Sequence, residues 1–234
     1  MFNDSEGERL QASKSTDPRA VGLDEGFLIM LGHLIETALS LSACLSSADA
    51  GQMSRCETLA MEVRELERSL TRRLLASREE GDRFKALIRL PFLLLRIEEK
   101  LDYILNCCRL KCKEGISFNG KAEAHLQQLI AILVDMMNNL RDAFSVSDAL
   151  LVKSIISEGC ELSRIIRDFR SAYWCRPRIG PLALQATAIY LDILDAVKSA
   201  NEDVGNICTT LLEIGTIPAA SAKVSERIDT GKFQ

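Results

Sequence analysis

The chain has 234 residues, which is enough for one large domain or two small ones with a sizeable core. Hydrophobic residues make up 47% and charged residues 26%, as in soluble globular proteins, and the low share of aromatic residues (5%) favours helices. The formal net charge of −4, and the lack of aromatic residues interleaved with basic ones, give no reason to expect nucleic acid binding.

Residues 1–22 contain few apolar residues and show no periodicity, so we expect them to form a disordered arm. They mix acidic and basic residues, unlike a signal or transit peptide, and no run of about 18 uncharged apolar residues follows. We therefore expect a cytoplasmic protein without a membrane span. Residues 215–234 are expected to form a flexible tail.

Helical periodicity of the apolar residues between these ends predicts about six helices. Asp49 is the expected N-cap of the second helix, and Ser147 or Asp148 that of the fifth. Pro91 is expected either to kink the third helix or to begin a second segment. The helices are expected at roughly 24–47, 50–78, 83–114, 121–144, 149–174 and 181–213.

The eight cysteines lie within apolar helical patterns and form no Cys-x-x-Cys pair, which is typical of reduced thiols in a core. The only histidines are His33 and His125. The sequence contains no Glu-x-x-His pair, no Gly-x-Ser-x-Gly motif and no glycine-rich phosphate loop. We therefore expect that the chain is not an enzyme.

An internal repeat appears at an offset of about 100 residues. The expected caps Asp49 and Asp148 align at nearly this offset, and so do two polar motifs. Glu98, Asp102 and Asn106 form the first motif, and Lys198, Glu202 and Asn206 form the second motif. The repeat predicts an all-α protein of two tandem three-helix bundles, residues 23–116 and residues 117–214.

The architecture and the repeated motif resemble the PhoU family, whose members carry two three-helix repeats. The third helix of each family repeat holds a signature of the form E-R-I-G-D-x-x-x-N-I. In "IEEKLDYILNC", the first motif falls on the Glu, Asp and Asn of this signature. In "VKSANEDVGNIC", Lys198 and Glu202 replace the two acids, and Asn206 keeps the Asn. The resemblance covers about residues 28–214.

This resemblance implies a non-enzymatic regulator of phosphate uptake and signalling that contacts a phosphate transporter or a sensor kinase. It leaves a homodimer open and allows at most a peripheral place at a membrane. Some family members bind multinuclear iron or zinc clusters between the third-helix signature and an acidic D-x-x-x-D or D-x-x-x-N motif on the second helix. The resemblance therefore makes the first motif a candidate set of metal ligands.

The chain departs from the family at this second-helix motif. The apolar pattern places Ala60 and Arg64 at the acidic positions of the first repeat, and Gly159 and Ser163 at those of the second. Metal clusters need oxygen ligands from more than one helix, and a neighbouring basic side chain repels the cation. We therefore expect no cofactor. The second motif is degenerate, and in the first motif a salt bridge to Arg64 is favoured over iron or zinc.

The end of the fifth expected helix is a candidate partner surface, because aromatic and arginine residues are frequent interface anchors. The same residues are equally suited to closing the end of the bundle. They are Arg170, Tyr173, Trp174 and Arg176. Two alternatives to a phosphate regulator remain: a bundle with one metal cluster in the first repeat, and a plain helical interaction module unrelated to phosphate.

Overall fold

The computed structural model describes residues 23–47, 49–77, 81–146, 148–174 and 181–216. The expected N-terminal arm and most of the expected C-terminal tail lie outside these residues. The described ranges contain helices and no strand, which confirms the predicted all-α class. The helices are α1 (Leu23–Ser46), α2 (Ala50–Ala76), α3 (Asp82–Leu87), α4 (Arg89–Lys113), α5 (Gly120–Val146), α6 (Ala149–Trp174) and α7 (Pro181–Thr216).

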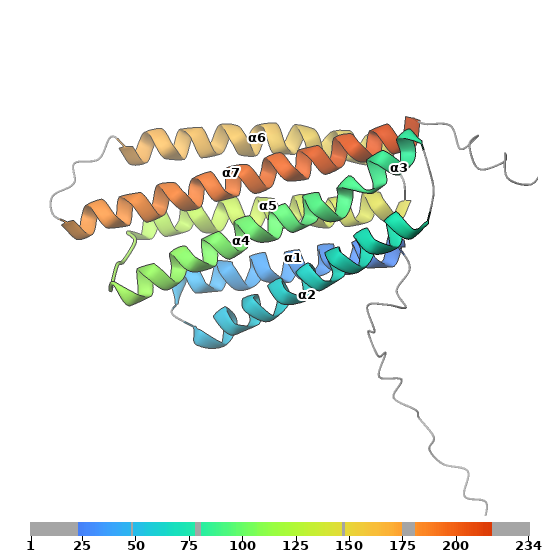
Figure 1. Ribbon diagram of the computed structural model, residues 1–234. Helices are drawn as coiled ribbons and strands as arrows, with labels where there is room; N and C mark the ends of the chain where they lie inside the picture. The colour runs from blue at the N-terminus through green and yellow to red at the C-terminus, as the bar shows by residue number, and fades with distance from the viewer. Residues whose placement is uncertain (1–22, 48, 78–80, 147, 175–180, 217–234) are drawn as a thin grey trace, which may run out of the picture.

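The expected third helix is divided in two, because α3 and α4 meet at Ile88. Pro91 is the third residue of α4, a place where the missing N–H costs no helical hydrogen bond. A second segment therefore begins next to this proline, which is one of the two predicted outcomes. Figure 1 shows α3 as a short piece at the end of the bundle where α4 starts.

Aspartates cap α2 and α6, as predicted. The Asp49 carboxylate accepts hydrogen bonds from two N–H groups at the start of α2, at 2.8 and 3.2 Å. The Asp148 carboxylate accepts the equivalent bonds at the start of α6, at 2.8 and 3.4 Å. Ser147, the other residue considered for this cap, lies outside the described residues. Each carboxylate satisfies donors that have no partner inside their own helix.

Replacing Asp49 with alanine should lower the free energy of unfolding by about 1 kcal/mol, because the first turn of α2 loses its acceptor. Equilibrium urea unfolding, followed by circular dichroism, measures the change. Asp49→Ser is the matched control, because serine is also a good N-cap and should keep most of the stability. An equal loss in both variants would show that the carboxylate does not act as a cap.

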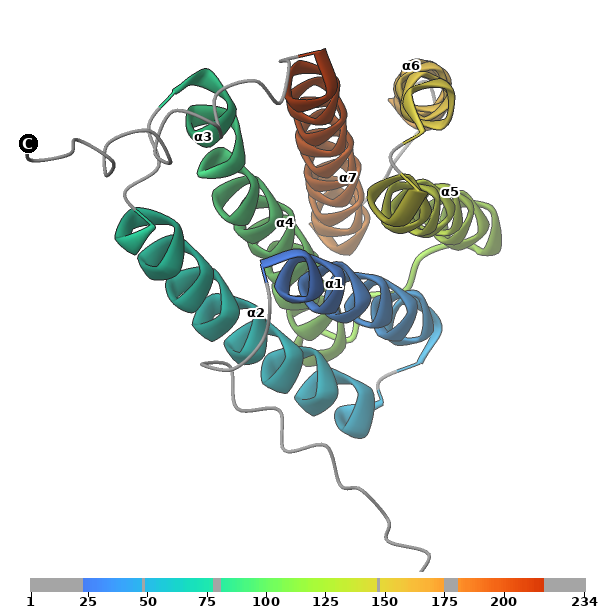
Figure 2. The ribbon, with the colours of Figure 1, turned by 90° about the vertical axis from the view of Figure 1, so that its right-hand side faces the viewer.

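The helices form two groups that meet through their corresponding members. In the first group α2 packs on α1 and α4, and in the second group α6 packs on α5 and α7. The two groups join where α1 packs on α5 and α4 packs on α7. Figure 2 shows the outer helices α2 and α6 on opposite sides of the bundle. Two packed three-helix units are thus confirmed, with α3 as an extra piece, while the repeat boundaries at 23–116 and 117–214 stay a prediction.

The helix α1 is more apolar than the sequence analysis allowed for. Its span Asp24–Ser46 contains an 18-residue window with a mean hydropathy of 1.7 and is long and apolar enough to cross a membrane by length and composition alone. In the bundle, however, α1 packs against α2, α4 and α5, and 56% of that window is buried. A helix with neighbours on several sides needs apolar residues around most of its circumference, so α1 is explained as a core helix.

Candidate functional site

The first motif lies on the face of α4 that packs against α2. Glu98 is 1% exposed, and Asp102 lies one helical turn further along and is partly exposed. Arg64 of α2 reaches both carboxylates, because its Nη2 atom lies 3.2 Å from Glu98 Oε1 and 3.6 Å from Asp102 Oδ2. The salt bridge predicted for this arginine is therefore present.

Burial raises the pKa of Glu98 to about 7, and the Arg64 guanidinium opposes this rise. The Asp102 carboxylate adds to the rise, since two negative charges one helical turn apart repel. The second carboxylate oxygen of Glu98, Oε2, is buried and has no hydrogen-bond partner among the described residues. Arg64 thus compensates only part of the cost of burying this carboxylate in its charged form.

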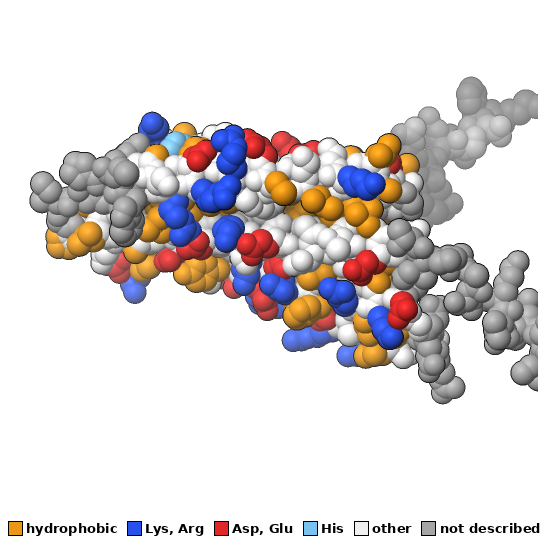
Figure 3. Space-filling view, turned by 90° about the horizontal axis from the view of Figure 1, so that it is seen from above, with side chains coloured by type: hydrophobic (Ala, Val, Ile, Leu, Met, Phe, Trp, Pro, Cys, Tyr) orange, Lys and Arg blue, Asp and Glu red, His pale blue; other side chains and the backbone are white. Residues whose placement is uncertain are grey.

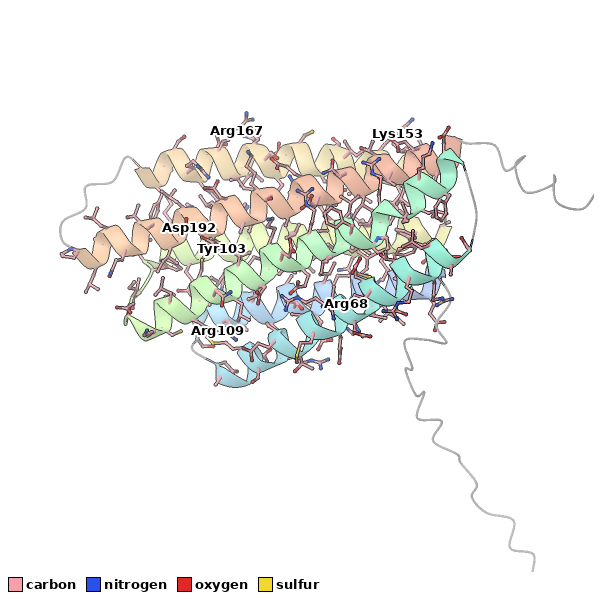
Figure 4. All side chains as sticks on the ribbon, in the orientation of Figure 1. Arg68, Tyr103, Arg109, Lys153, Arg167 and Asp192 are labelled. Atoms are coloured by element: carbon pink, nitrogen blue, oxygen red, sulfur yellow. The ribbon has the colours of Figure 1, made fainter. Side chains whose placement is uncertain are left out.

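The third residue of the first motif also meets an arginine. Arg109 donates from Nη1 to Asn106 Oδ1 at 3.3 Å, and from Nη2 to a carboxylate oxygen of Glu57 on α2. Figure 4 shows Arg109 between the last turns of α4 and the first turns of α2. All three side chains of the motif are therefore engaged by guanidinium groups.

These residues do not fit an iron or zinc cluster. The Arg64 guanidinium occupies the space between the two carboxylates where a cation would have to lie, and Ala60 gives α2 no ligand. A cation there would have oxygen ligands from one helix only and a positive charge as neighbour. Within the described ranges, no group of three or more His, Cys, Asp or Glu side chains is placed to hold a metal ion. The absence of a resident metal stays a prediction.

The second motif lies on α7, and its two charged residues pair with each other. Lys198 Nζ is 3.3 Å from Glu202 Oε1, and both side chains are about half exposed. Asn206 is exposed as well. The facing positions on α6 are Gly159 and Ser163, which carry no charge. The second motif therefore offers a single carboxylate, already paired with a lysine.

Comparison with known proteins gives this arrangement a context. No family model and no curated protein matches the sequence. The crystal structure of PhoU from Pseudomonas aeruginosa matches with a TM-score of 0.74 at 18% identity, over 82% of this chain and 95% of that chain. The phosphate transport system regulatory protein PhoU from Streptococcus pneumoniae matches with a TM-score of 0.71 at 19% identity, over 83% and 93%. This chain has a PhoU-like fold.

The PhoU-like fold confirms the resemblance suggested by the two motifs. At such low identity the likeness establishes the path of the chain and not the role of any side chain. The contacts at the first motif are therefore described for this chain alone: an arginine of α2 holds two carboxylates of α4 together.

A buried asparagine, Asn201, joins the last helix of this PhoU-like fold to α6 and was not predicted. The residue is 5% exposed, and its Nδ2 atom donates to Gly159 O at 2.9 Å and to Ser163 Oγ at 3.0 Å. Its Oδ1 atom has no hydrogen-bond partner among the described residues. The signal in the sequence was weak, because two acidic residues follow Asn201 in "SANEDVG" and nothing marks the asparagine as the buried one.

A second polar residue that the sequence analysis missed joins the two halves of the PhoU-like bundle. Asp203 of α7 is fully buried, and its Oδ1 atom lies 3.1 Å from Arg96 Nη2 of α4. Burial raises the pKa of Asp203, and the Arg96 guanidinium opposes the rise. A signal was present, since Asp203 follows Ala200 and precedes Ile207 at the three- and four-residue spacing of an apolar stripe.

The predicted partner surface is wrong at Tyr173. This residue is 6% exposed, and its ring stacks on that of Tyr190 with the centroids 3.8 Å apart. Tyr173 lies on the inward side of α6 and closes the end of the bundle, which was the other role considered for these residues. Arg170 pairs with an aspartate of α7. The side chain of Trp174 and the whole of Arg176 lie outside the described residues.

Proposed function

We propose that this chain is a cytoplasmic, non-enzymatic regulator of phosphate uptake or phosphate signalling that acts by binding a phosphate transporter or a sensor kinase. The observation that carries the proposal is the PhoU-like fold, which covers 95% and 93% of two PhoU chains. One of the two is described as the regulatory protein of a phosphate transport system.

The described histidines and the buried thiol of Cys108 support a binding role over a catalytic one. His33 lies 3.0 Å from Glu62, and burial lowers its pKa. His125 stacks on Phe169 with the ring centroids 3.7 Å apart. Burial raises the pKa of Cys108 to about 12, so its thiol stays protonated and is a poor nucleophile. Each of these three groups contacts neighbouring side chains or is buried within the bundle.

The outward side of α4 offers an apolar surface to such a partner. Phe92, Tyr103 and Leu110 are each about half exposed. Tyr103 lies about three helical turns after Phe92, and Leu110 lies about two turns after Tyr103. The three side chains therefore follow one line along α4, which we call the α4 stripe. Figure 1 shows α4 running along the front of the bundle between α2 and α7. Glu99 and Asn106 are exposed on the same line, so a helix of a partner protein would meet three apolar side chains with polar ones between them.

Affinity capture from phosphate-starved cells tests this proposal. The full chain should retain a phosphate transporter subunit or a sensor kinase, identified by mass spectrometry. The double variant Phe92→Glu plus Leu110→Glu should lose that protein, because it places two charges in the α4 stripe.

Leu150→Glu is the matched control, because Leu150 is an exposed apolar residue on α6 and this variant should keep the captured protein. Circular dichroism establishes that each variant is folded. If the wild-type chain retained neither a transporter subunit nor a kinase, the regulator proposal would fail and a plain helical interaction module would be favoured.

A further inference from the structure

A groove between α6 and α7 plays no part in the function proposed above. It has a volume of about 550 Å³ and opens to solvent. Its apolar lining comes from Met136 of α5 and from Ile155 and Ile156 of α6, and α7 lines the other side. Small-molecule sites in proteins have volumes of about 300–1,000 Å³, so this space, the α6–α7 groove, is of suitable size.

The groove depends on the glycine at position 159 of α6. A Cβ atom on Gly159 would lie 2.8 Å from Asn201 Oδ1 and 3.3 Å from the terminal methyl group of Met136. Gly205 lines the groove from α7, also without a side chain. A larger residue at position 159 would therefore push against the asparagine and take up part of the groove.

Asn201 lies beside the groove and holds a buried acceptor for which the described residues supply no donor. Both hydrogens of Nδ2 are used, by Gly159 O and by Ser163 Oγ, and Oδ1 is left without a partner. Turning the amide over would place Oδ1 against the Gly159 carbonyl oxygen, so the geometry fixes which end is the oxygen. A buried acceptor without a donor is costly. The Oδ1 atom is itself buried and out of a ligand's reach, so Asn201 holds the wall of the groove in place through its Nδ2 bonds to α6 and does not contact the ligand.

Basic side chains line the opening of the groove. Arg167 of α6 forms no ion pair with any described residue, while Lys198 of α7 shares its charge with Glu202. Figure 4 places Arg167 on the outer side of α6. Figure 3 shows basic side chains in a row across the face that α6 and α7 form. Among the residues that line the groove, two carry a positive charge and one, Glu202, carries a negative charge, and the excess of positive charge favours an anionic ligand.

We propose that the α6–α7 groove binds a small organic anion. The acidic group of the ligand pairs with Arg167 and Lys198, and its apolar part packs on Ile155 and Ile156. This proposal does not depend on the chain being a phosphate regulator, since it rests on the groove alone.

Two exposed thiols make the test internally controlled. Cys160 lines the groove, whereas Cys112 lies on α4 and does not. The full chain is alkylated with a maleimide, and the rate at each cysteine is followed by mass spectrometry of its peptide. Adenosine 5′-monophosphate and L-glutamate are the probes, one with a phosphate and one with carboxylates, and sodium sulfate is the comparison anion. At ten times its Kd, a binding probe should slow the reaction of Cys160 about tenfold and leave Cys112 unchanged.

Charge variants decide whether the groove itself is responsible. Arg167→Gln plus Lys198→Gln should abolish most of the protection of Cys160. Arg164→Gln is the matched control, because Arg164 lies on the same helix, pairs with Glu161 and Asp168, and does not line the groove. The proposal is overturned if neither probe protects Cys160, if sulfate protects it equally well, or if Arg164→Gln removes the protection too.

Discussion

The Glu98→Gln variant should gain stability relative to the wild-type chain as the pH rises from about 4 to about 8, by about 3 kcal/mol in total. Glutamine has the shape of a protonated glutamate and does not titrate. The difference between the two unfolding free energies therefore isolates the contribution of the Glu98 carboxyl.

The direction follows from the pKa of Glu98, which rises from an ordinary 4.5 to about 7 in the folded chain. Between these values the folded state holds a proton that the unfolded state releases. The stability that this carboxyl contributes is thus fully present below about pH 4.5 and is lost as the pH rises through about 7. In Glu98→Gln the contribution of position 98 to stability stays constant across the same range, because glutamine does not titrate.

Urea unfolding at a series of pH values measures both curves. Glu65→Gln is the control, because Glu65 is an exposed carboxylate of α2, and its curve should run parallel to that of the wild-type chain. Arg64→Met should steepen the dependence on pH, because it removes the guanidinium that favours the charged form of Glu98. Parallel curves for Glu98→Gln and the wild-type chain would contradict the burial of a titrating carboxyl at this position.

The double variant Ala60→Asp plus Arg64→Asp should change the chain from one that retains no metal to one that retains about one equivalent or more of iron or zinc. It removes the guanidinium between the two carboxylates and gives α2 two acids that face Glu98, Asp102 and Asn106. Oxygen ligands would then come from two helices, as a hard cation requires. Without a cation, four crowded carboxylates should repel and lower the melting temperature.

Elemental analysis after dialysis against ferrous iron or zinc measures the metal, and thermal unfolding with and without a chelator measures its effect on stability. Arg64→Met is the control, because it removes the positive charge without adding a ligand. Two results would count against this account: a double variant that stays free of metal, or a wild-type chain that binds more than one equivalent and loses it on Glu98→Ala plus Asp102→Ala.

The part of the site that could be predicted is the part that depends on which side of a helix each residue lies. The apolar pattern of α2 gave the side of the helix on which Arg64 lies, and the motif gave the side on which Glu98 and Asp102 lie, so their ion pair could be predicted. The cap at Asp49 followed from local chemistry alone. The division of the third expected helix was one of two outcomes that Pro91 allowed, since a proline at this place fits a kink as well as a start.

Burial of polar side chains depended on how many neighbours a helix has, which a single sequence does not state. Glu98 is buried because α4 packs against α1, α2, α3 and α7, so that neighbouring helices cover most of its circumference. The same holds for Asn201, since α7 also contacts four helices, whereas the apolar stripe around Asp203 did give a signal in the sequence. Tyr173 was ambiguous for a related reason, because a ring at a helix end suits a partner and a bundle end equally.

Neither three-helix unit could stay soluble by itself with the inner faces of its central helices uncovered. The surfaces through which α1 meets α5 and α4 meets α7 are rich in leucine and isoleucine, and water would have to cover them. A single unit would therefore have to pair with a second copy of itself, each covering the other. In this chain the two units cover each other and differ in what they carry: one holds a salt bridge at Arg64, and the other has an open groove beside Asn201.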